Sequence, residues 1–238
     1  MNNDIETYRV LLIVPAYNEE KSILSVARSI EAAGYDYVIV NDGSRDRTLE
    51  ICREHHLNYL NLSKNLGIGG AVQAGHRYAL EHGYDVDIQF DGDGQHDVSF
   101  VPDLLRAISD GADLVVGSRF IEETDGFQST WLRRVGIHWL SFWIKVCSGM
   151  KVLDVTSGFR ACNRNVIQLF CGYYPADYPE PESIVYAGRQ GFSIREVPVL
   201  MHERQGGTSS IGGLKSVYYM ISVTLSVITT RFARGRKR

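Results

Sequence analysis

The chain has 238 residues, of which 44% are hydrophobic, and a formal net charge of −3, which suits one well-packed domain with an appendage. Its four cysteines show no Cys-x-x-Cys spacing, so the sequence predicts neither a zinc site nor a disulfide framework. No run reaches the roughly 18 apolar residues of a membrane-spanning helix, and the polar N-terminus does not resemble a signal peptide, so we expect a cytoplasmic protein.

Short apolar runs alternate with helical patterns along the first half of the chain. Buried-type strands are predicted at Arg9–Pro15, Tyr37–Val40, Tyr59–Leu62, Asp87–Phe90 and Asp113–Gly117. Helices are predicted at Glu19–Ala33, from about Asp46 to His55, from a glycine loop at Asn65–Gly70 to about Glu81, and at Val101–Ser109. This alternation predicts an α/β fold with a mostly parallel central sheet flanked by helices.

Two apolar helical segments follow. One ends near Cys147 and holds all three tryptophans, Trp131, Trp139 and Trp143, beside basic residues, which is typical of a membrane interface. A core helix is the alternative. The other segment, Leu214–Phe232, is amphipathic and too short to span a bilayer. Its predicted apolar face is Leu214, Val217, Tyr218, Ile221, Leu225, Ile228 and Phe232, opposite Ser222, Ser226 and Thr229.

The end of the chain is strongly basic. Five of the last eight residues are Arg or Lys, so the other 230 residues carry a charge of about −8. Such a cluster suits an anionic membrane surface, whereas a solvated tail is the simpler alternative. We expect residues 211–238 to form an interfacial helix with a basic tail that docks on a membrane or on a small membrane protein, with no nucleic-acid partner. Packing of this helix on the catalytic domain, or in a homodimer, is the alternative.

Acidic loops follow three of the predicted strands, at Tyr17–Glu19, Asp42–Asp46 and Asp91–Gln95. Because the carboxyl ends of parallel strands meet at one edge of a sheet, these loops are expected to converge. The oxygen atoms of Asp91, Asp93 and Gln95 suit Mg²⁺ or Mn²⁺. Mg²⁺ completes its coordination with water and substrate phosphate, so the pattern indicates a phosphorylated substrate. An isolated Asp-x-Asp is also compatible with a polar turn.

Several motifs, taken together and in order, resemble a known family. Val14–Glu20, Val40–Ser44, Asn65–Ala71 and Asp91–Asp93 look like the GT-A glycosyltransferases of family 2. Val116–Phe120 and Asp154–Arg160 are similar to the branch that contains the dolichol- and polyprenyl-phosphate sugar synthases. The resemblance spans about residues 9–210. It implies a GT-A domain over residues 1–210, a nucleotide-diphosphate sugar donor, a divalent cation (Mg²⁺ or Mn²⁺) and inversion at the sugar carbon. It also implies a polyprenyl-linked acceptor at the cytosolic face of the membrane.

The resemblance also assigns residues by position. The residues that would bind the nucleotide sugar are Pro15, Tyr17, Glu19, Asp42, Gly70, Asp91, Gly92 and Asp93, and those that would hold the metal are Asp91, Asp93 and Gln95. Arg119 and Arg204 would contact phosphates during catalysis. Arg133, Arg134, Ser157 and Arg160 would meet the acceptor. The chain departs from that branch where a Ser is usual, at Ile137 and His138, and where a Lys is usual, at Thr208–Ser210.

The acceptor decides whether a general base is needed. A phosphate is already anionic and needs none, whereas the hydroxyl of a lipid-linked glycan requires one. Candidate bases are Asp154, Glu180 and Glu182. The two glutamates also fit a first helical turn in which acidic side chains and proline stabilise the helix N-terminus.

Other classes of protein fit less well. A sugar-nucleotide pyrophosphorylase would carry a Gly-rich basic loop where this chain has Pro15–Glu20. The Gly67-x-Gly69 loop has Val72 at the third position of the dinucleotide fingerprint, which disfavours a hydride-transfer enzyme. A non-catalytic binding subunit is disfavoured by the retained Asp91, Asp93 and Gln95.

Overall fold

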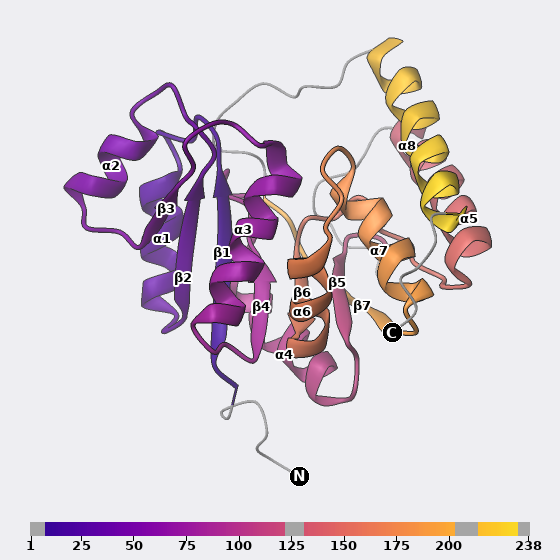
Figure 1. Cartoon of the computed structure of the whole chain (residues 1–238), viewed down its shortest axis with the longest axis horizontal. Coiled ribbons are helices and arrows are strands. Elements are labelled where there is room, and N and C mark those ends of the chain that lie inside the picture. The colour runs from indigo at the N-terminus through magenta and orange to yellow at the C-terminus, as the bar shows by residue number, and fades with distance from the viewer. Residues whose placement is uncertain (1–7, 122–130, 203–213, 233–238) are drawn as a thin grey trace.

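The computed structural model describes residues 8–121, 131–202 and 214–232 (Figure 1). The first half of the chain contains β1 (Val10–Ala16), α1 (Ile23–Ala32), β2 (Asp36–Asn41), α2 (Thr48–Glu54), β3 (Tyr59–Asn61), α3 (Gly67–Glu81), β4 (Val86–Gln89), α4 (Val101–Ser109) and β5 (Leu114–Ser118). The second half contains α5 (Trp131–Ser148), β6 (Arg160–Asn163), α6 (Arg164–Gly172), α7 (Pro179–Arg189), β7 (Ile194–Pro198) and α8 (Leu214–Phe232). The predicted elements of the first half are all present, with boundaries shifted by a few residues.

The strands form one seven-stranded sheet in the order β3-β2-β1-β4-β6-β5-β7. Neighbouring strands are parallel except at β6, which runs antiparallel to both β4 and β5. The prediction of a mostly parallel sheet is therefore confirmed, but the strand pattern did not predict β6, β7 or α6. Because β6 is reversed, its first residue, Arg160, lies opposite Gln89 and Val116, at the edge where β4 and β5 end.

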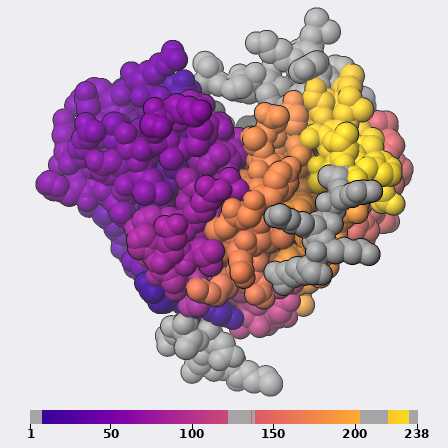
Figure 2. Space-filling view, in the orientation of Figure 1, coloured from indigo at the N-terminus to yellow at the C-terminus, as the bar shows by residue number. Residues whose placement is uncertain are grey.

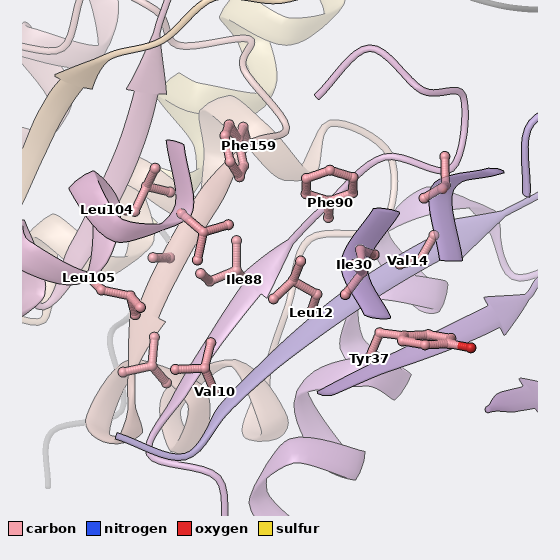
Figure 3. Packing of buried hydrophobic residues seen from close by; sticks show 14 of the residues in the cluster. Val10, Leu12, Val14, Ile30, Tyr37, Ile88, Phe90, Leu104, Leu105 and Phe159 are labelled. Atoms are coloured by element: carbon pink, nitrogen blue, oxygen red, sulfur yellow. The ribbon is translucent and has the colours of Figure 1, made fainter. Parts of the chain in front are cut away.

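Alternate residues of β1 point to opposite faces of the sheet, and both faces are buried. Leu12 and Val14 pack in a cluster with α1 and α4, whereas Leu11 and Ile13 pack in a cluster with α3 and α6. Figure 3 shows part of the first cluster, where Leu12 and Ile88 lie between Phe90 and Val10. Burial on both faces explains why the strands read as continuous apolar runs.

The α3 N-terminus differs from the predicted glycine loop. The helix begins at Gly67, so Gly69 and Gly70 belong to its first turn. A Cβ atom on Gly69 would lie 2.1 Å from the Pro175 carbonyl oxygen. The glycine thus serves close packing of helix against loop, which sequence alone does not distinguish from a flexible loop.

Helices α5, α7 and α8 pack around a third cluster, at the opposite end of the sheet from α2 and β3 (Figure 1). Its buried members include Leu140 and Ile144 of α5, Ile184 of α7, and Val223 and Val227 of α8. Figure 2 shows α8 as an outer layer beside α5. None of the described helices combines the length and the apolar character needed to cross a bilayer.

The face of α8 that packs on the protein coincides only in part with the predicted apolar face. The face that packs on the protein carries Val223, Thr224 and Val227, whereas Ile221 and Leu225 are 56% and 58% exposed. The terminal Phe232 is 75% exposed. Met220 and Ile228 pack against the same cluster. Ile221, Leu225 and Phe232 therefore point outward, while the remaining described apolar residues of α8 contact the protein.

Candidate active site

A cavity of about 470 Å³ opens at the edge of the sheet where β1, β2 and β4 end. Its lining residues are Pro15, Ala16, Tyr17, Glu19, Asp42, Asn65, Gly67, Ile68, Ala71, Asp91, Gly92, Asp93 and Glu180. The three acidic loops expected to converge each contribute at least one residue. Glu180 comes from the start of α7, so one wall is built from the second half of the chain.

Two loops of the cavity are tied together by side-chain to backbone hydrogen bonds. The Asn18 amide donates to Ser44 Oγ at 3.0 Å, and Asn18 Oδ1 accepts from the Arg45 amide at 2.8 Å. The Glu19 amide donates to Thr48 Oγ1 at 2.8 Å. Asn18 adopts φ of 60°, a left-handed conformation that asparagine tolerates. These contacts fix the backbone that directly follows Tyr17, a residue that is 44% exposed and lines the cavity.

Asp42 connects the end of β2 to the start of α3. Its Oδ1 accepts a hydrogen bond from the Leu66 amide at 2.7 Å, and Asn65 Nδ2 donates to the Asp42 carbonyl at 3.0 Å. Burial raises the pKa of Asp42, although the backbone N–H groups of Leu66 and Gly67 act in the opposite direction. Asn65, Gly67 and Ile68 also line the cavity, although they were not among the predicted site residues. They lie there because Asp42 holds the start of α3 at the end of β2. The recognisable signal for them was the Asn65–Ala71 motif itself.

Hydrogen bonds within the Asp91–Gln95 loop and from Ser22 hold this loop in place. Asp93 is 2% exposed, and its Oδ1 accepts from the Gln95 amide at 3.0 Å. Ser22 Oγ donates to the Gly92 carbonyl at 2.7 Å, which anchors the loop to the segment before α1. Gln95 does not line the cavity, and its Nε2 donates to the His202 carbonyl at 3.4 Å.

Gly158 packs directly against the Asp91 carboxylate. A Cβ atom at this glycine would lie 3.0 Å from both carboxylate oxygens of Asp91. The neighbouring Ser157 is buried and does not line the cavity; its Oγ accepts from the Phe159 amide at 3.2 Å. The loop that leads into β6 thus restricts the space around Asp91.

The partly buried Arg119 and the fully buried Asp154 form an ion pair outside the cavity lining. Arg119 donates from Nε and Nη2 to the two oxygens of Asp154, both at 2.7 Å, and its amide donates to Oδ2 at 3.1 Å. The Asp154 amide in turn donates to Glu196 Oε1 at 2.8 Å. With its side chain 0% exposed, Asp154 holds Arg119 in place and does not reach the cavity.

Arg160 is also buried, and its guanidinium is engaged by nearby oxygens. Nε donates to the Ser157 carbonyl at 2.7 Å, and Nη1 donates to the Glu180 carbonyl at 2.6 Å and to Ser183 Oγ at 2.8 Å. Nη2 donates to the Val155 carbonyl at 3.2 Å. In this arrangement Arg160 connects the loop before β6 to the start of α7.

The two glutamates of α7 have different surroundings. Glu180 lines the cavity, and burial raises its pKa while the charge of Arg160 lowers it in part. Glu182 faces α8, where Thr230 Oγ1 donates to its Oε2 at 3.3 Å, and burial likewise raises its pKa. Of the three candidate bases, the structure therefore brings only Glu180 to the cavity.

Other predicted residues are not brought to the cavity or cannot be placed. Gly70 lies in α3 but does not line the cavity. The side chains of Arg133 and Arg134, and the whole of Arg204, lie outside the described residues.

A second group of potential metal ligands lies in the core and not in the cavity. His76, Asp87 and Cys162 are buried, with ligand atoms within 4.8 Å of one another. However, His76 Nδ1 and Asp87 Oδ2 are 2.6 Å apart. Two ligands of a tetrahedral ion at bond lengths of about 2 Å lie about 3.3 Å apart. The shorter distance describes a direct hydrogen bond between α3 and β4.

Residues 11–170 match the family described as Glycosyl transferase family 2. The chain belongs to this family. Among curated proteins, this glycosyltransferase is 33% identical to an undecaprenyl-phosphate mannosyltransferase of Micrococcus luteus, over 97% of the chain and 98% of the relative. It is 30% identical to a UDP-N-acetylglucosamine–dolichyl-phosphate N-acetylglucosaminyltransferase of Methanococcus voltae, over 92% of the chain and 97% of the relative.

Among solved structures, the glycosyltransferase is similar to glucosyl-3-phosphoglycerate synthase from Mycobacterium tuberculosis, solved with Mn²⁺, UDP-glucose and phosphoglyceric acid. The TM-score is 0.70 at 17% identity, and the match covers 97% of this chain and 82% of that one. This likeness confirms the predicted GT-A fold.

The Arg119–Asp154 pair predicts a large stability effect with a matched control. Arg119→Met leaves Asp154 buried without its cation, which we expect to lower the free energy of unfolding by about 3 kcal/mol. Arg106→Met breaks the Arg106–Asp103 pair, whose side chains are 62% and 45% exposed, and should cost no more than about 1 kcal/mol. Urea unfolding of both variants checks this; equal losses would contradict the buried pairing.

Proposed function

We propose that this protein is an inverting, cation-dependent glycosyltransferase that moves a sugar from a nucleotide-diphosphate sugar to a polyprenyl phosphate. The observation that carries the proposal is the charge of the cavity. Five carboxylates line it, from Glu19, Asp42, Asp91, Asp93 and Glu180, and no Lys or Arg is among its described lining residues. A diphosphate entering such a site is repelled unless a cation accompanies it.

The donor set of the cavity fits a hard divalent cation. Asp91 and Asp93 offer carboxylate oxygens, and no sulfur or imidazole atom lines the cavity in the described part of the chain. Such oxygen ligands favour Mg²⁺ or Mn²⁺, which bind one or two protein carboxylates and otherwise substrate phosphate and water. When bound, the cation would act as a Lewis acid that stabilises the departing nucleoside diphosphate.

The remainder of the cavity suits a nucleoside. The exposed ring of Tyr17 offers an apolar surface for a base or ribose, and Pro15 continues that surface. Asp42, already held by the Leu66 amide, can accept hydrogen bonds from base or ribose donors. Ile68, 40% exposed in the first turn of α3, lines the same cavity as Tyr17.

A phosphate acceptor agrees with the small number of available bases. Its oxygen is anionic near neutral pH and can attack the sugar carbon directly, with inversion and without proton removal. Asp154 is committed to Arg119, and Glu182 is turned toward α8. The two relatives described above are named for undecaprenyl phosphate and dolichyl phosphate, which are both lipid phosphates.

The principal test is transfer of a radiolabelled sugar. Purified protein is offered a panel of nucleotide sugars with Mg²⁺ or Mn²⁺ and polyprenyl phosphate, and butanol-extractable label is counted. We expect transfer by the wild type and a loss of at least about 10²-fold in Asp93→Asn, because a buried cation ligand is removed. Asp103→Asn, on the surface of α4, is the control. Turnover by Asp93→Asn close to wild type would contradict the role of the cation.

Glu180 favours a second candidate, transfer to a hydroxyl of a lipid-linked glycan. It lines the cavity near Asp91, and its raised pKa would suit a general base. If the acceptor is a phosphate, Glu180→Gln should transfer sugar at a rate within about tenfold of the wild type. If the acceptor is a hydroxyl, the variant should transfer sugar about 10²–10⁴-fold more slowly and lose the acid limb of the pH–rate profile, since only the deprotonated carboxylate accepts a proton. Measuring transfer from pH 5 to 9 distinguishes the two acceptors.

We further propose that the outer faces of α5 and α8 contact the membrane that holds the acceptor. Trp139, Phe142 and Val146 of α5 are 52%, 57% and 48% exposed, next to the exposed Ile221 and Leu225 of α8. Trp139 Nε1 donates to Thr224 Oγ1 at 3.1 Å, which joins the two helices at this face. Lys145 is exposed on α5, and basic residues follow α8, which suits anionic lipid headgroups.

Substituting one residue of this face tests the proposal. Leu225→Glu should weaken binding to vesicles of anionic phospholipid by about tenfold or more, since burial of a leucine contributes about 1.5–3 kcal/mol. Tyr173→Glu, at a 49% exposed aromatic residue beyond α6, is the matched control and should bind as the wild type does. Equal binding by both variants would contradict lipid contact. A change in self-association, measured by analytical ultracentrifugation, would instead assign this face to a homodimer.

A further inference from the structure

The imidazole of His96 contacts Asp91, in the loop that precedes it. The side chain is 2% exposed. The Asp91 amide donates a hydrogen bond to His96 Nδ1 at 2.9 Å, and His96 Nε2 lies 3.5 Å from Asp91 Oδ2. One ring therefore meets both the backbone and the carboxylate of the same residue.

The direction of the first hydrogen bond determines the tautomer. A backbone amide can only donate, so Nδ1 must present its lone pair, and the neutral imidazole then carries its proton on Nε2. This places a polar N–H group beside the Asp91 carboxylate, at the long limit of a hydrogen bond. Both nitrogens of His96 thus act on Asp91.

The ring of His96 is held by two buried aromatic side chains. It stacks on Phe159 with a centroid distance of 4.8 Å and an interplanar angle of 18°, and it meets the edge of Phe90 at 5.5 Å and 81°. Phe90 and Phe159 also pack edge to face (Figure 3). Phe90 immediately precedes Asp91, and Phe159 follows Gly158, whose Cα packs on the Asp91 carboxylate.

We propose that His96 is a positioning residue that fixes the backbone and carboxylate of Asp91 and thereby sets the affinity of the cavity for a divalent cation. The inference rests on the proposed function, in which Asp91 is a ligand of that cation. A residue that orients a metal ligand typically changes metal affinity by about 10–100-fold when it is replaced. His96 itself does not line the cavity, so it acts through Asp91.

The test compares two substitutions of His96. His96→Phe fills the aromatic space and removes both nitrogens, whereas His96→Asn places an acceptor near the Nδ1 position and leaves a void. We expect His96→Phe to weaken Mn²⁺ binding by at least about tenfold and His96→Asn to stay within about threefold of wild type. Binding is measured by electron paramagnetic resonance of free Mn²⁺ while each protein is titrated with Mn²⁺ alone.

Thermal unfolding of the same samples separates positioning from general damage. Phe170→Leu removes a buried ring in the cluster on the other face of the sheet and should lower Tm without changing Mn²⁺ affinity. His96→Gln, which reaches toward the Nε2 position without an acceptor at Nδ1, replaces His96→Phe if the latter does not fold. It should also bind Mn²⁺ at least about tenfold more weakly.

The outcomes are distinguishable. Wild-type affinity in His96→Phe alongside lost affinity in Asp91→Asn would overturn the role of His96 and leave the cation site intact. An equal loss in His96→Asn and His96→Phe would also overturn it. Failure of the wild type to bind Mn²⁺ would overturn the proposed function, and the inference with it.

Discussion

Mutual repulsion among carboxylates is the constraint around which this glycosyltransferase is arranged. Five acidic side chains line one cavity of about 470 Å³. Two unit charges 4 Å apart repel by about 4 kcal/mol at an effective dielectric constant near 20. Burial raises the pKa of Asp42 and of Glu180, and the charge of Asp91 adds to the effect at Glu180. Backbone N–H groups offset part of this cost, since Leu66 donates to Asp42 and Gln95 donates to Asp93. The remaining excess of negative charge is what makes a cation and a diphosphate suitable joint ligands.

Arg119 and Arg160 lie near this acidic cavity but are not among its lining residues. Arg119 is paired with Asp154, and Arg160 donates to the carbonyls of Ser157, Val155 and Glu180. Both depend on the reversed strand β6, which brings the preceding loop to the edge where β4 and β5 end. The same loop places Gly158 against Asp91. The antiparallel strand β6 and the loop before it thus contact two of the acidic residues of the cavity, Glu180 through Arg160 and Asp91 through Gly158.

Helices α5 and α8, at the far end of the sheet, leave several large apolar side chains exposed. The side of α8 that faces the protein carries valines, Met220, Ile228 and polar residues such as Thr230, which donates to the buried Glu182. Ile221 and Leu225 are left exposed beside Trp139 and Phe142. A helix packed only for stability would bury its largest apolar side chains, because burial of each contributes about 1.5–3 kcal/mol. Exposure of these side chains to water therefore destabilises an isolated domain. Contact with a membrane or with a protein surface would remove this destabilisation.

Local pattern was enough to predict the first half of the fold and the convergence of its acidic loops. Apolar runs bounded by Gly, Asp and Pro indicate strands directly, and parallel strands bring Asp42 and Asp91 to one edge whatever their side chains contact. Only the tertiary structure decided which candidate bases reach the cavity, because the surroundings of Asp154, Glu180 and Glu182 come from distant parts of the chain: Arg119, the cavity itself and Thr230. The reversed β6 and the stacking of His96 on Phe159 could not be predicted locally either, since strand direction and ring packing depend on residues far apart in the chain.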